Sequence, residues 1–173
     1  WFHWEPENQY SSTNEPLLGY YDSGSAAVRQ HHLEWAEQAG VDVFISSWWG
    51  INSYEDERLP ELLDAAVGTP VKFCIYFESN HEMEAASPEE RPGIVKKHLR
   101  YALDQYGSHP AFFRFREKPV VFLYALPFLR MPLQDWQTVL NDLRAEGYEF
   151  FINVDSYEPP AVQVFDGFHT YNP

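Results

Sequence analysis

The chain of 173 residues has a single cysteine, few basic residues and no long apolar run. The lone Cys74 excludes an intrachain disulfide, and its place in an apolar segment predicts a buried thiol. Lys and Arg total 12 against 26 Asp and Glu, giving a formal charge of -14. Phosphate binding needs a basic surface, so nucleic acid and anionic membranes are poor partners. Without a run of about 18 apolar residues, no membrane-spanning helix is predicted.

Motifs for nucleotides, metals and activated nucleophiles are also missing. Neither Gly-x-Gly-x-x-Gly nor Gly-x-x-x-x-Gly-Lys-Ser/Thr follows a predicted strand, which disfavours nucleotide binding. The histidines lack a spacing typical of metal ligands, and no Ser/His/Asp signature is present. We therefore predict neither a cofactor nor a metal. The chain begins at Trp1 without an initiator Met, which indicates residues upstream; nothing specifies the oligomeric state.

The residues that are present alternate between helical and strand patterns. Hydrophobic residues make up 45% and aromatics 17%, a composition of a globular domain. Apolar stripes of helical period, each closed by glycine, alternate with short apolar runs. The pattern predicts helices over 25–39, 56–67, 87–106 and 133–146, and strands over 41–47, 71–77, 119–124, 149–154 and 165–169.

Nearly continuous apolar strands separated by helices predict an α/β fold with a parallel sheet buried on both faces. An open doubly wound sheet and a closed barrel share this alternation, but the missing nucleotide motifs favour the barrel. A complete (β/α)8 barrel needs roughly 250 residues. We therefore predict that residues 1–173 form a single, partial (β/α)8 TIM-type barrel domain with about five to six parallel strands.

Polar and aromatic side chains follow the predicted strands, where function collects in such folds. Trp48 and Trp49 offer flat apolar faces for a sugar ring; alternatively, one of them caps the core and only the other, or neither, meets ligand. Glu78 ends a strongly apolar strand and could act as an acid, a base or a hydroxyl acceptor, unless it forms a salt bridge, for instance to Arg91.

Glycoside hydrolysis ordinarily needs two carboxylates that flank the scissile bond. The candidates for such a pair are Asp22, Glu78, Asp155 and Asp166. Spacing in the sequence does not say which of them converge.

Several segments, in order, resemble glycoside hydrolase family 99, the endo-α-mannosidases and endo-α-mannanases. The most specific is Ala39-Gly40-Val41-Asp42 with Ser47-Trp48-Trp49-Gly50. Further segments similar to the family are Pro16 to Ser23, Val71 to Glu78, Tyr106 to Arg114, Lys118 to Tyr124 and Phe165 to Tyr171. Departures are Ser79-Asn80, where the family usually has Pro-Tyr, and Ala125, where Asp is common.

The resemblance implies a (β/α)8 barrel that cleaves internal α-mannosidic linkages with retention, and a glycan as the partner. The family's carboxylate pair lies in an Asn-Glu-Trp-x-Glu motif that we expect after Pro173, so the 173 residues alone are expected to be inactive. The first barrel strand is expected before Trp1-Phe2-His3-Trp4. The predicted substrate-binding residues are Trp48, Trp49, Glu78, Tyr21, Tyr124, Asp166 and Tyr171.

Two alternatives remain open from the sequence. One is a related barrel of polysaccharide biosynthesis that resembles a glycosyltransferase. The other is a non-catalytic glycan-binding module. If the family resemblance holds, it also implies a location outside the cytoplasm or in the secretory pathway.

Overall fold

The computed structural model describes residues 14–124, 130–156 and 158–171. Five parallel strands form the sheet: β1 (Val43–Trp48), β2 (Lys72–Phe77), β4 (Lys118–Leu123), β5 (Phe151–Asp155) and β6 (Gly167–His169). Their order in space is their order in the chain, and the two-residue strand β3 (Arg114–Phe115) pairs antiparallel with β4. The predicted parallel sheet is confirmed. The first barrel strand, expected before Trp1, lies outside the described residues.

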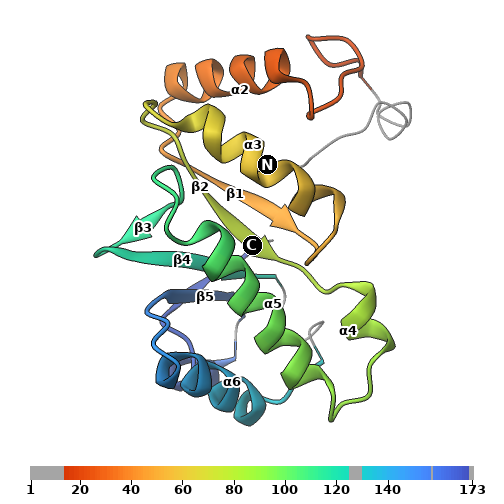
Figure 1. The fold of residues 1–173 in the computed structure, drawn as a ribbon, viewed down its shortest axis with the longest axis vertical. Helices are drawn as coiled ribbons and strands as arrows, with labels where there is room; N and C mark the ends of the chain where they lie inside the picture. The colour runs from red at the N-terminus through yellow and green to blue at the C-terminus, as the bar shows by residue number, and fades with distance from the viewer. Residues whose placement is uncertain (1–13, 125–129, 157, 172–173) are drawn as a thin grey trace.

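The long helices are α2 (Ala26–Gln38), α3 (Tyr54–Ala66), α5 (Arg91–Tyr106) and α6 (Leu133–Ala145). In Figure 1, α3, α5 and α6 cover one face of the sheet, and α2 packs beside α3. A doubly wound sheet carries helices on both faces, whereas a barrel carries them only outside. Consecutive strand order with helices on one face is therefore the arrangement of part of a β/α barrel.

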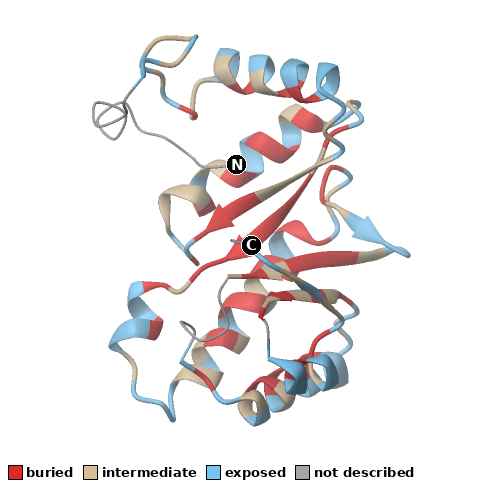
Figure 2. Cartoon of the chain, turned by 180° about the vertical axis from the view of Figure 1, so that it is seen from behind, coloured by how far each residue is buried: buried red, intermediate tan, exposed pale blue. Residues whose placement is uncertain are grey.

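The core lies between this helical layer and the sheet, where Figure 2 shows the buried residues concentrated. Alternate strand residues point toward the helices because the side chains of a strand alternate between its two faces. Phe73, Ile75 and Phe77 of β2 are fully buried in this core, and Cys74 between them is buried as predicted. None of the described helices is long and apolar enough to cross a membrane.

Two local predictions need correction. The helix expected over 87–106 begins at Arg91 in the structure. Residues 88–90 form a turn that leads into it, and the Glu90 carboxylate accepts from the Ser87 N–H. Pro92 occupies the first turn of α5, where its missing N–H costs nothing. Between β2 and α5, where neither a helix nor a strand was predicted, lies a short helix, α4 (His81–Ala85). It is capped by the Asn80 side chain, which accepts from the Met83 N–H at 2.9 Å.

Candidate functional site

The two adjacent tryptophans at the end of β1 differ in burial. Trp48 has no exposed surface; its ring stacks on Tyr101 and its indole N–H donates to Asp56 at 2.9 Å. Trp49 is 45% exposed. Trp49 is the first residue after β1, at the start of the β1–α3 loop. Of the pair, only Trp49 presents an accessible ring, which is the alternative in which one tryptophan belongs to the core.

Glu78 follows β2 directly and is held beside β1. It is only 6% exposed, its backbone N–H donates to the Trp48 carbonyl at 3.0 Å, and its carboxylate accepts from the Ser47 hydroxyl at 2.7 Å. Burial raises the pKa of Glu78, while the Ser47 hydrogen bond lowers it and the Glu55 charge raises it. The net effect is a carboxyl group that stays protonated to a higher pH than an exposed one.

The salt bridge considered as an alternative for Glu78 is not formed. The Arg91 guanidinium instead donates to the backbone carbonyls of Met83, Ala86 and Arg130. In the part of the chain that the structure describes, no lysine or arginine pairs with Glu78. Its carboxylate therefore keeps capacity to accept further hydrogen bonds.

The face of the sheet opposite the helices carries an aromatic cluster. Tyr76 donates to His169 Nε2 at 2.8 Å, and its ring lies 5.5 Å from that of Tyr124 and 5.9 Å from that of Tyr171. The Tyr124 and Tyr171 rings meet edge to face at 5.3 Å. Burial and the Asp155 charge raise the pKa of Tyr76, so its hydroxyl stays protonated. Two predicted residues, Tyr124 and Tyr171, are thus in contact.

This inner face is hollowed by a cavity of about 330 Å³. It is lined by Ile45, Ser47, Tyr76, Phe122, His169, Thr170 and Tyr171. Ser47 lines this cavity and also donates a hydrogen bond to Glu78. The aromatic cluster and the buried carboxylate therefore border the same side of the sheet. A wall of aromatic rings beside a carboxylate suits the apolar faces and the hydroxyl groups of a sugar.

The other two predicted residues lie apart from this cluster. Tyr21 packs edge-on against His32 of α2, and its neighbour Asp22 accepts from the Tyr54 hydroxyl at 2.8 Å. Asp166 precedes β6, where it pairs with Arg144 at 3.0 Å and accepts from the Ile152 N–H. That position is the amino end of the strands, opposite to Glu78.

Asp56 supports the site but was not expected from the sequence. It is 5% exposed, and its two oxygens accept from the Trp48 indole, the Asn52 N–H and the hydroxyls of Tyr101 and Tyr106. These donors fix the loop between β1 and α3, which carries Trp49. The one feature of the sequence that points to Asp56 is its position three residues after Ser53. That spacing is typical of a helix N-cap, and in the structure the Ser53 side chain accepts from the Asp56 N–H.

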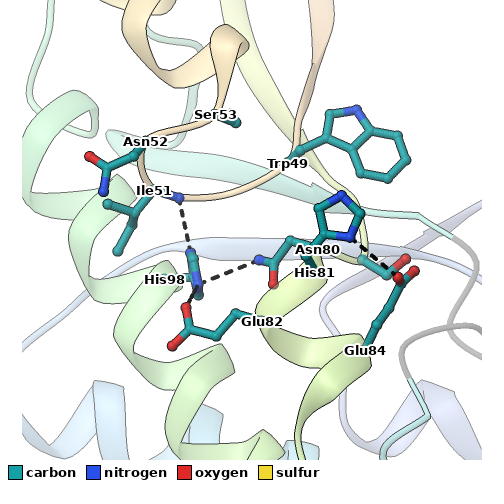
Figure 3. Close-up of a pocket in the computed structure, with 10 residues that line it drawn as sticks. Trp49, Ile51, Asn52, Ser53, Asn80, His81, Glu82, Glu84 and His98 are labelled. Atoms are coloured by element: carbon teal, nitrogen blue, oxygen red, sulfur yellow. Dashed lines mark hydrogen bonds and ion pairs between the residues drawn. The ribbon is translucent and has the colours of Figure 1, made fainter.

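A second hollow, which we call the rim cleft, lies between the β1–α3 loop and α4 (Figure 3). Its volume is about 380 Å³. It is lined by Trp49, Ile51, Asn52, Ser53, Ser79, Asn80, His81, Glu82, Glu84 and His98. Over the described ranges, no group of three or more His, Cys, Asp or Glu is placed to hold a metal ion.

A singly wound parallel sheet with its polar and aromatic side chains gathered at one end defines the chain as part of a β/α-barrel protein. The sequence profile of "Glycosyl hydrolase family 99" matches residues 3–172. The chain belongs to this family.

Among curated proteins, the chain is 24% identical to mouse "Glycoprotein endo-alpha-1,2-mannosidase", over 96% of this chain and 38% of that protein. It is 26% identical to the Xenopus laevis protein of the same name, over 96% of this chain and 40% of that protein. The chain therefore spans about two fifths of the length of these relatives.

Solved structures agree with the family assignment. The GH99 endo-alpha-mannosidase from Bacteroides thetaiotaomicron matches with a TM-score of 0.76 at 26% identity, covering 91% of this chain and 47% of that chain. A second structure of that enzyme, in complex with bis-tris-propane, matches with a TM-score of 0.81 at 24% identity, covering 99% and 57%. The predicted barrel-type fold is confirmed by these matches.

Proposed function

We propose that the chain supplies substrate-binding walls of an endo-acting, retaining α-mannosidase, in which Glu78 binds hydroxyl groups of a mannose-containing glycan. The observation that carries the proposal is the buried Ser47–Glu78 pair. Ser47 lines the same cavity as the aromatic cluster, and Trp49, two residues further along the chain, is exposed. The names of the relatives suggest α-1,2-linked mannose.

In this proposal Trp49 stacks on a sugar ring, while Tyr124 and Tyr171 form the opposite wall. Glu78 accepts from sugar hydroxyls through the oxygen capacity that Ser47 leaves free. Trp48 acts from the core by supporting the Trp49 loop, and Asp166 takes no part because it lies at the amino end of the sheet. We retain Tyr21 as a wall residue in this proposal. Its neighbour Asp22 accepts from the hydroxyl of Tyr54, the first residue of α3.

We further propose that residues 1–173 alone do not hydrolyse glycosides. Retaining hydrolysis needs two carboxyl groups about 5–5.5 Å apart on either side of the bond. Of the two buried carboxylates in the described residues, Asp56 is saturated by its four donors and faces the helical layer. Glu78 is then left without a buried acidic partner in this part of the chain.

The test is to incubate the full-length protein with an α-1,2-linked manno-oligosaccharide and to analyse the products by chromatography and NMR. Internal cleavage with retained anomeric configuration, and no need for a nucleotide sugar, would support the proposal. A requirement for a nucleotide sugar would favour the glycosyltransferase-like alternative. Binding without cleavage would favour a glycan-binding module, and cleavage by residues 1–173 alone would refute the proposed inactivity.

A further inference from the structure

The rim cleft lies next to the proposed substrate site but does not include its central pair. Trp49 lines the cleft, whereas Glu78 and Ser47 do not. In Figure 3 the β1–α3 loop carries Trp49 and Asn52 along one side, and α4 carries His81 and Glu84 along the other. The cleft therefore adjoins the ends of β1 and β2, because Trp49 follows β1 and Ser79 follows Glu78 directly.

The floor of the cleft is rigid because one buried histidine joins both of its sides. His98 of α5 accepts from the Ile51 N–H through Nδ1 at 3.2 Å, so its Nε2 carries the proton and donates to Glu82 at 3.0 Å. Gly50 packs directly on this ring: a Cβ there would lie 2.7 Å from His98 Cε1. The cleft is thus preformed, as small-molecule sites usually are.

Groups at the edge of the cleft have hydrogen-bonding capacity to spare. Within the described ranges, the side chains of Asn52 and Ser79 make no hydrogen bond, and Glu84 is met only by the exposed His81 at 3.8 Å. Asn52 has φ of 63°, a left-handed conformation that asparagine tolerates, and its N–H is fixed on Asp56. An amide, a hydroxyl and a carboxylate thus surround a space bordered by an indole ring.

The charges of the cleft select the kind of ligand. Glu82 is engaged by Lys97 and His98, so Glu84 carries the negative charge that remains open to a ligand. A phosphate or a uronic acid would meet this charge unfavourably, whereas the hydroxyls of a neutral sugar can donate to it. Its volume of about 380 Å³ lies in the range of small-ligand pockets.

We propose that the rim cleft is an additional subsite that binds a neutral hexopyranose unit of the glycan, remote from the bond that reacts. This inference rests on the proposed function, because it takes the ligand to be the mannose-containing glycan held at Glu78. Trp49 forms the boundary between the two regions, and Asn52 and Glu84 bind the hydroxyl groups of the remote unit. Binding of a remote unit supplies energy that positions the reacting sugar.

The experiment is isothermal titration of the full-length protein with α-1,2-mannobiose and α-1,2-mannotetraose. Two hydrogen bonds to the remote unit should make the tetrasaccharide bind about tenfold more tightly than the disaccharide. The double variant Asn52→Gly, Glu84→Gln should lose most of that advantage and keep its affinity for the disaccharide within about twofold. Glycine retains the left-handed conformation at residue 52, and the exposed Glu89→Gln serves as the matched control.

The outcomes separate this inference from the proposed function. Equal affinity of the wild-type protein for both sugars, or a double variant that keeps the advantage of the longer sugar, would overturn the subsite, whether or not the protein hydrolyses mannosides. A loss of the length advantage in the double variant supports the subsite even if no hydrolysis occurs. Failure of both sugars to bind would defeat the subsite and the mannoside proposal together.

Discussion

The Ser47 hydroxyl donates a hydrogen bond of 2.7 Å to the buried Glu78 carboxylate, joining the ends of β1 and β2. Because a buried carboxylate loses hydration, this hydrogen bond stabilises the charged form that the low exposure of Glu78 disfavours. The pair therefore sets both the position and the protonation of the group that we propose to bind substrate.

Replacing Ser47 with Ala should raise the pKa of Glu78 further, because the hydrogen bond that lowers it is lost while burial remains. If the charged carboxylate binds substrate, the acidic limb of the profile of kcat/KM against pH moves to higher pH in the full-length enzyme. The profile is measured by initial rates between acidic and neutral pH. An acidic limb that stays in place or moves downward would contradict the assigned role of Ser47.

Gly50 should be irreplaceable for a steric reason rather than for its conformation alone. It has φ of 100°, and a Cβ there would come within 2.6 Å of Asn80 Nδ2. Gly50→Ala should lower the free energy of unfolding by more than Gly40→Ala, which has φ of 70° and nothing within 4 Å of the added Cβ. The control carries only the conformational strain, of order 1 kcal/mol. Equal losses in urea denaturation would rule out the clash.

Asp56→Asn should destabilise the protein strongly. The substituted amide cannot accept from all the donors that face the two Asp56 oxygens, so buried donors around the amide nitrogen lose their partner. We expect a loss of about 2–4 kcal/mol in the free energy of unfolding, measured by denaturant titration. Glu37→Gln, at an exposed position on α2, should change it by less than about 0.5 kcal/mol. A similar small change for Asp56→Asn would show that the carboxylate is not a structural centre.

The order of strands and helices could be predicted from the sequence because apolar residues recur with the helical period in each helix and form a short continuous run in each strand. The periodicity alone could not separate a barrel from an open doubly wound sheet, since the choice between helices on one face and on both is made by tertiary packing; the missing nucleotide motifs and the family resemblance supported the barrel. Trp48 and Trp49 show the same limit: the sequence places both at the end of a strand, but only the Asp56 partner identifies which ring is buried. Asp166, which the family resemblance suggested as a binding residue, lies just before β6 at the amino end of the strands and apart from the aromatic cluster.

The most direct test of the central claim is the affinity of the full-length Glu78→Gln variant for an α-1,2-linked manno-oligosaccharide, measured by isothermal titration beside the wild-type protein. Loss of a charge-assisted hydrogen bond to a sugar hydroxyl should weaken binding by about 10- to 100-fold. Glu57→Gln, an exposed position on α3, should bind as the wild-type protein does. Unchanged affinity in Glu78→Gln would show that the buried carboxylate does not bind the substrate.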